Sequence, residues 1–145
     1  MNHVKSLTQV GIRSVRNKKS QVDDSLNDGN RVIGMKEFGE MGPEGMADLV
    51  PKDAPVYVSI DIDVLDLPLV PGCVSAEPNG MTYIELRDSL ATLAKHSEII
   101  GFDLVEVNPQ LDVGTGITSY MGAHTIVEFL GQICDQPRWI SKLSN

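Results

Sequence analysis

The sequence predicts an α/β domain built around a parallel sheet, and three observations support this. Residues 56–63 alternate branched apolar side chains with polar ones, which is typical of a strand. Residues 99–107 are almost continuously apolar, as expected of a parallel strand buried on both faces. Amphipathic helical segments lie between and after these two strands. Strands that alternate with helices in this way form βαβ units.

The first third of the chain predicts short elements. Residues 7–12 and 31–35 are expected to form strands. Residues 16–30 are polar and charged and contain the turn sequence Asn-Asp-Gly-Asn, so a surface loop or insertion is expected there. Pro43 is favoured as the first residue of a short helix that reaches residue 49, because proline is well tolerated at that position. The proline-containing segment 50–55 should end this helix.

The remaining elements are predicted by capping and periodicity. Thr82 and Glu85 form a capping box that should open a helix ending near His96. A last helix is expected over residues 118–133, with one apolar side. The residues assigned to that side are Ala123, Ile126, Val127, Leu130 and Ile133. Together these elements make a single domain of residues 1–145.

Composition excludes several classes of protein. The 145 residues suffice for one domain with a core, and the net charge of −8 disfavours a nucleic-acid binder while suiting a cationic substrate. No run of 18 apolar residues predicts a membrane span. Cys73 and Cys134 are too few for a disulfide framework or a structural zinc site. We therefore expect a cytoplasmic protein.

Three carboxylates are expected to meet at one edge of the sheet. Asp61 and Asp63 lie two apart at the end of one predicted strand, and Glu106 lies at the end of the next. Two carboxylates whose Cβ atoms are roughly 6–7 Å apart on one face repel each other unless a cation lies between them. A divalent metal is the natural occupant, with Asp66 orienting a ligand from behind. A carboxylate cluster that only binds loop amides and water remains the alternative.

Longer motifs extend this pair of aspartates. Residues 59–63 (SIDID) are followed at fixed spacing by Pro71-Gly72 and Gly80, residues 101–109 read GFDLVEVNP, and residues 10–14 read VGIRS. The order and spacing of these motifs resemble the ureohydrolase family, which includes arginases and agmatinases. Glu77 and Pro78, just before Gly80, resemble the agmatinase branch.

The resemblance implies a three-layer αβα sandwich with a parallel sheet and a site for two Mn²⁺ ions. It implies hydrolysis of a guanidino compound such as agmatine to urea and an amine. By motif match, Asp61 and Asp63 would be metal ligands, Glu106 would contact the substrate guanidinium, and Glu77 would contribute weakly to substrate binding. A carboxylate is a suitable partner for a planar, forked cation.

Two departures from the family pattern affect these expectations. Leu67 replaces a usual proline, and Pro68 follows it. The two N-terminal family segments that carry histidine ligands, of Gly-Gly-Asp-His and Asp-Ala-His-x-Asp type, have no match. The chain is thus expected to represent only the C-terminal half of the family fold. The histidines present, His3, His96 and His124, lack metal-ligand spacing and are predicted to be structural or solvated.

Three functions follow as alternatives. The first is a guanidino hydrolase of which this chain forms the C-terminal half. The second is a non-catalytic remnant or interaction module that binds cations weakly. A nucleotide-binding domain is the third, and it is disfavoured because residues 114–116 (GTG) lack the lysine of a phosphate loop. The expected partners are a small cationic guanidino substrate and either further copies of the chain or a chain supplying the N-terminal half, because the strand at residues 7–12 would otherwise leave an unpaired edge.

Overall fold

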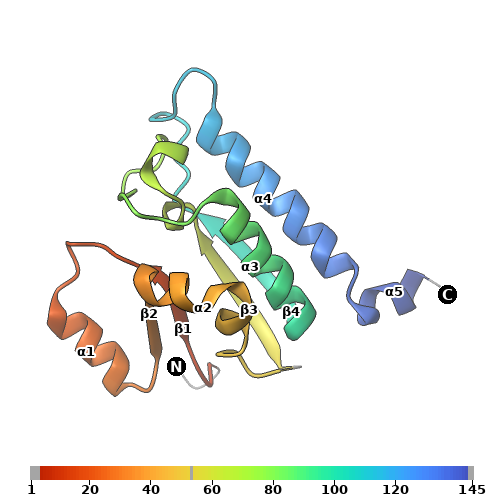
Figure 1. The fold of residues 1–145 in the computed structure, drawn as a ribbon. Helices are drawn as coiled ribbons and strands as arrows, with labels where there is room; N and C mark the ends of the chain where they lie inside the picture. Colours follow the sequence, from red (N-terminus) through yellow and green to blue (C-terminus); the bar gives the residue numbers. More distant parts are fainter. Residues whose placement is uncertain (1–3, 53, 144–145) are drawn as a thin grey trace.

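A computed structural model describes residues 4–52 and 54–143, and its ribbon is shown in Figure 1. Strands and helices alternate along the chain, as predicted. Their order is β1 (Thr8–Ile12), α1 (Lys19–Asn27), β2 (Arg31–Gly34), α2 (Met35–Ala47), β3 (Pro55–Asp61), α3 (Tyr83–His96), β4 (Glu98–Val105), α4 (Ile117–Cys134) and α5 (Pro137–Leu143). Two short 3-10 helices, Ile62–Val64 and Leu67–Leu69, follow β3.

The strands pair in parallel, which confirms the predicted α/β class. They form two separate two-stranded sheets within the described residues, one of β1 and β2 and the other of β3 and β4. In the second sheet Asp61 lies opposite Val105, so both strands end at the same edge. The carboxyl end of such a sheet is where α/β proteins usually bind ligands.

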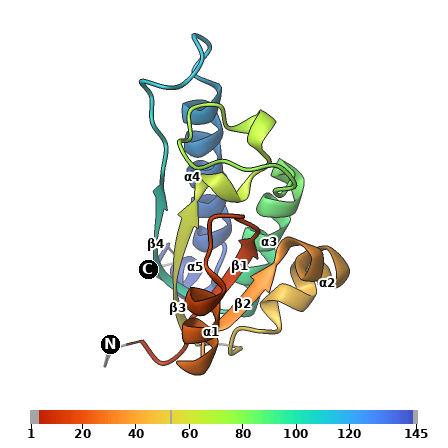
Figure 2. The same cartoon turned by 90° about the vertical axis from the view of Figure 1, so that its left-hand side faces the viewer.

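Helix α3 packs against α2 and against α4, and Figure 2 shows α3 and α4 on the same side of β3 and β4. The core lies between these helices and the strands. Phe102 of β4 packs edge-to-face against Phe129 of α4, with 5.0 Å between the ring centroids. Ile60 and Phe129 are almost fully buried, so the inner face of β3 and β4 is the apolar face.

The outer face of β3 and β4 corrects the prediction that residues 99–107 are buried on both faces. Tyr57 is 60% exposed there, and its ring lies over Gly101, where an added Cβ would approach it to 3.0 Å. The Tyr57 and Ser59 hydroxyls donate hydrogen bonds to Asp103, at 2.9 and 2.7 Å. Gly101 and Asp103 interrupt the apolar run on alternate positions, and this places a polar face toward solvent.

Helix α1 lies in the segment predicted as a loop, so that prediction was wrong. The helix buries none of its residues. The Gln21 side chain accepts a hydrogen bond from the Lys18 amide, and Lys19 forms an ion pair with Asp23 one turn later. Such local polar contacts favour a helix whose apolar pattern is limited to Val22 and Leu26, too short for a prediction that relied on apolar periodicity.

Helix α2 begins before the predicted start. Its residues from Met35 onward are helical, and Gly42, with φ of 67°, kinks it. Pro43 restarts the helix beyond the kink, as expected of a proline with no amide to pair. The part before the kink buries Phe38, which closes the core against β1 and β2.

The buried side of α4 also differs from the prediction. Ala123, Val127 and Leu130 are exposed, and the buried line consists of Thr118, Gly122, Thr125, Phe129 and Ile133. Small residues are buried because the helix lies close to the strand, and a Cβ on Gly122 would meet Val107 at 3.3 Å.

Among the described residues, no helix is both long and apolar enough to span a membrane.

Candidate metal and substrate site

Strand β3 ends at Asp61, and Asp63 lies in the 3-10 helix Ile62–Val64 rather than on the strand. This corrects the expectation that both side chains point from one strand face. The Asp61 carboxylate accepts a hydrogen bond from the Asp63 amide at 3.0 Å, so Asp61 itself caps the turn. The aspartates therefore remain neighbours, with turn geometry between them.

Glu106 lies near this pair of aspartates, and its charge acts on Asp61. It directly follows Val105, the residue opposite Asp61 in the sheet. Partial burial raises the pKa of Asp61 to about 6, and the charges of Asp63 and Glu106 add to this shift. Glu106 also has a φ of 68°, in the left-handed region that non-glycine residues rarely occupy. Crowded like charges and a strained backbone at one strand end are typical of a functional site.

An open depression of about 430 Å³ lies beside Glu106 and is lined by Val74 and residues 106–110. Its volume falls within the range of small-molecule sites. Glu106 is the carboxylate among the residues that line this depression, so a small cation that entered it would meet Glu106. This depression is therefore the better candidate for substrate binding.

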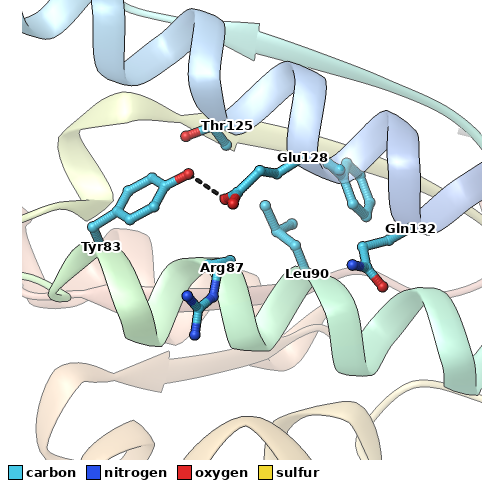
Figure 3. A pocket seen from close by; sticks show the side chains of 7 residues that line it. Tyr83, Arg87, Leu90, Thr125, Glu128 and Gln132 are labelled. Atoms are coloured by element: carbon cyan, nitrogen blue, oxygen red, sulfur yellow. Dashed lines mark hydrogen bonds between the residues drawn. The ribbon is translucent and has the colours of Figure 1, made fainter.

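A second cavity lies between α3 and α4 (Figure 3) and holds only about 90 Å³. The Tyr83 hydroxyl donates a hydrogen bond to Glu128 across it. Burial and this contact raise the pKa of Tyr83 to about 12. The cavity is too small for a substrate, and the Glu128 carboxylate in it already accepts the Tyr83 hydroxyl.

Asp66 lies just beyond the cluster and holds the loop that follows. Its carboxylate accepts a hydrogen bond from the Gly80 amide at 3.0 Å. Leu65 and Met81 form an isolated parallel bridge at the same point. A Cβ on Gly80 would lie 2.5 Å from the Leu65 backbone, so only glycine allows this approach. Gly80 of the sequence motif thus brings two loop segments together behind Asp63.

Glu77 is held by the segment that follows β1. The Ser14 hydroxyl donates to its carboxylate at 2.6 Å, and Arg16 donates to the same oxygen at 3.1 Å. The Val15 amide donates to the second oxygen at 3.3 Å. These contacts lower the pKa of Glu77 below its ordinary value, the Ser14 hydrogen bond most of all. Its role in substrate binding stays a prediction.

Sequence reasoning missed Arg13, whose guanidinium donates hydrogen bonds to five backbone carbonyls. These belong to Gly11, Asp63, Leu65, Glu77 and Pro78. Four of the five lie 50 or more positions away in sequence. The only available signal was its place directly after a predicted strand, within the VGIRS motif.

The donor set suits Mn²⁺ in its chemistry, since carboxylates are ligands that this ion prefers. Within residues 4–52 and 54–143, however, no group of three or more potential ligand residues could hold a metal. His96 Nε2 lies 2.8 Å from the Val50 carbonyl, and the His124 ring stacks on Tyr83. His3 lies outside the described residues. Among the described residues, the candidate ligands are the neighbouring carboxylates of Asp61 and Asp63.

A parallel α/β fold with carboxylates at the carboxyl ends of its strands is an arrangement that many ligand-binding and metal-binding proteins share. The chain belongs to the arginase family, whose family model matches residues 1–131. Proclavaminate amidinohydrolase of Streptomyces clavuligerus is 39% identical over 132 residues, and guanidinopropionase of Pseudomonas aeruginosa is 39% identical over 127.

Solved structures agree with this assignment. The proclavaminate amidinohydrolase structure matches with a TM-score of 0.78 at 38% identity, covering 87% of this chain and 42% of that one. Formimidoylglutamase from Bacillus subtilis matches with a TM-score of 0.76 at 26% identity, covering 90% and 42%. The sequence match to proclavaminate amidinohydrolase covers 88% of this chain and 41% of that protein. The match to guanidinopropionase covers 84% of this chain and 39% of that protein. The chain thus spans about two fifths of the length of these relatives.

Proposed function

We propose that the chain forms part of a manganese-dependent hydrolase that cleaves a guanidino compound to urea and an amine. Asp61 and Asp63 would be ligands to the metal, and Glu106 would pair with the guanidinium. The observation that carries the proposal is the convergence of these carboxylates at one strand end, beside an open depression.

Each residue has a physical reason for its role. Asp61 and Asp63 concentrate negative charge that a divalent cation would neutralise. Burial, with a smaller contribution from this charge, raises the pKa of Asp61. Bound Mn²⁺ would supply the positive charge that makes water a nucleophile near neutral pH. Glu106, at the mouth of the depression, would orient the flat cation through paired hydrogen bonds.

The substrate is proposed to be agmatine-like. Glu77 and Pro78 before Gly80 support the agmatinase branch, and the net charge of −8 favours a cationic ligand. The names of the relatives cover a wider set of reactions, including those of a guanidinopropionase and a formimidoylglutamase. An assay should therefore compare agmatine with guanidinobutyrate, guanidinopropionate and arginine.

A chimera tests the proposal. This chain would replace the matching segment of the Pseudomonas aeruginosa guanidinopropionase, and urea release would be measured in the presence of Mn²⁺. We expect turnover that Asp61→Asn, Asp63→Asn and Glu106→Gln abolish. The matched control is Asp103→Asn, which removes a carboxylate from the outer sheet face and should keep most of the activity. A folded, manganese-loaded chimera without urea release contradicts the proposal.

A second candidate is a non-catalytic module that binds cations weakly. It is favoured by the absence, among the described residues, of any group of three potential metal ligands. Weak Mn²⁺ binding by the chain itself, combined with an inactive chimera, would support this candidate.

A further inference from the structure

The segment that follows β1 contacts the site from a distant part of the sequence. Arg13 Nη2 donates to the Asp63 carbonyl at 2.7 Å and to the Leu65 carbonyl at 3.1 Å. The Asp63 amide is already bonded to Asp61. The peptide groups on both sides of the Asp63 Cα are therefore fixed, one by a proposed metal ligand and the other by Arg13.

The same guanidinium holds the second loop at the site. Nη2 donates to the Glu77 carbonyl at 2.7 Å, and Nε donates to the Pro78 carbonyl at 3.1 Å. Arginine carries five N–H donors in a rigid planar fork, so it can join several carbonyls from separate segments. Among the described residues Arg13 forms no ion pair, and backbone carbonyl groups are its acceptors.

The close approach that permits these contacts depends on Gly11. A Cβ at this position would lie 2.7 Å from Val64 Cγ2, and its φ of 86° also suits glycine. The end of β1 can therefore lie against the turn that carries Asp63. This brings the Arg13 side chain within reach of that turn, although β1 and β3 share no hydrogen-bonded ladder.

We infer that Arg13 is a positioning residue for the metal ligand Asp63, holding the turn 62–65 and the loop 77–78 in one arrangement. The inference rests on the proposed function for the identity of the metal. It assigns to the GIR segment a role in organising the site without contact to metal or substrate. A ligand whose backbone is fixed on both sides loses less conformational freedom when it binds a cation.

The affinity of the full chain for Mn²⁺ tests the inference. It is measured by electron paramagnetic resonance, from the loss of the signal of the free ion. Arg13→Met should weaken Asp63-dependent affinity about tenfold, the lower end for loss of a supporting contact. Arg13→Lys should recover only part of this affinity, because an ammonium cannot span the same carbonyls. The matched control is Arg16→Met, which loses contacts to Ser75 and Glu77 but none to Asp63. Its affinity should stay within about twofold of the parent, below any change expected of a supporting residue.

Circular dichroism at the same temperature establishes that each variant is folded. A folded Arg13→Met variant with unchanged Mn²⁺ affinity would overturn the inference and leave the proposed function standing. A parent chain whose Mn²⁺ binding is unaffected by Asp61→Asn and Asp63→Asn would instead contradict the proposed function.

Hydrogen exchange decides the inference independently of metal. In Arg13→Met the amides of residues 63–66 should exchange at least about tenfold faster, since local opening removes their protection. Amides in α4 report global stability and should change much less. Equal acceleration at both places would mean that Arg13 only stabilises the fold, and would refute the positioning role.

Discussion

At Asp61 a carboxylate is half-buried next to two others, and its ionised form is disfavoured. Burial, the largest cause, raises its pKa to about 6. The charge of Asp61 therefore lowers the stability of the metal-free protein at neutral pH. A residue retained in such a place is better explained by binding of a cation than by folding.

Asp61→Asn should therefore stabilise the metal-free chain at pH 8 by roughly 1–2 kcal/mol, after allowance for solvent screening. The folded-state pKa lies above the unfolded value of 3.8. The folded state thus binds more protons between these values, and the parent loses stability as pH rises through that window. The stabilisation by Asp61→Asn should vanish near pH 4. Urea unfolding at both pH values measures it, with exposed Asp24→Asn as the control, and a pH-independent effect would contradict the prediction.

Tyr83 should affect the stability of the protein at alkaline pH, in contrast to Asp61. Its folded-state pKa of about 12 lies above the ordinary tyrosine value of 10.0, so the folded state keeps a proton that the unfolded state loses. Stability should fall as pH rises between these values. Phenolate absorbance should reveal a late-titrating tyrosine that Tyr83→Phe removes. Tyr57→Phe is the informative comparison, because the hydrogen bond to Asp103 also raises the pKa of Tyr57. A titration curve unchanged by Tyr83→Phe would disprove the assignment of the late-titrating group to Tyr83.

At the scale of elements, helix α3 shows what sequence can predict. Its start is set by Thr82 and Glu85, whose reciprocal capping contacts lie within one turn. Helix α4 shows the limit, since its buried side is decided by how closely Gly122 lets it approach Val107. Local chemistry can be read from neighbouring residues, whereas a close approach depends on a segment elsewhere in the chain.

The two faces of α4 can be distinguished by truncation. Phe129→Ala should lower the free energy of unfolding by about 3–4 kcal/mol, because it removes a buried ring from the contact with Phe102. Val127→Ala should change it by less than about 0.5 kcal/mol, since Val127 is 66% exposed. Urea denaturation of both variants measures this. Equal losses would mean that the side of α4 carrying Val127 is buried as fully as the side carrying Phe129.

For the whole molecule, the motifs predicted the carboxylate cluster better than its surroundings. Asp61, Asp63 and Glu106 lie in two short sequence motifs, and the strands that lead into these motifs, β3 and β4, pair directly. Arg13 could not be assigned in this way, because four of its five acceptors lie 50 or more positions further along the chain. Contacts of this kind follow from the folded arrangement and leave no spacing pattern in the sequence.

The chain is expected to self-associate in solution. Its described residues form two two-stranded sheets with unpaired edges, and Tyr57, Ile100 and Val105 of the second sheet are exposed. The net charge of −8 opposes association, but salt screens it over about 8–10 Å. Light scattering should therefore show particles larger than 15.8 kDa that increase with salt. A monodisperse monomer at every salt concentration would contradict this expectation.

Mn²⁺ should bind the chain weakly, because its described carboxylates provide too few ligands for a tight site. Titration calorimetry should show no saturation at micromolar metal. The chain tested without a partner should release no urea from agmatine or arginine. Tight binding abolished by Asp61→Asn, or turnover lost in Glu106→Gln, would show that the chain holds a complete site.

The contact of Arg13 with the turn after β3 also couples the two sheets dynamically. Because β1–β2 and β3–β4 share no ladder, the first sheet can open without breaking a backbone hydrogen bond of the second. Each such opening would withdraw the guanidinium and free the Asp63 peptide. The fraction of time that Asp63 is correctly placed would then depend on the local unfolding equilibrium of a strand about fifty residues earlier in the chain. A substitution in β2, which pairs with that strand, would alter metal affinity without touching the site.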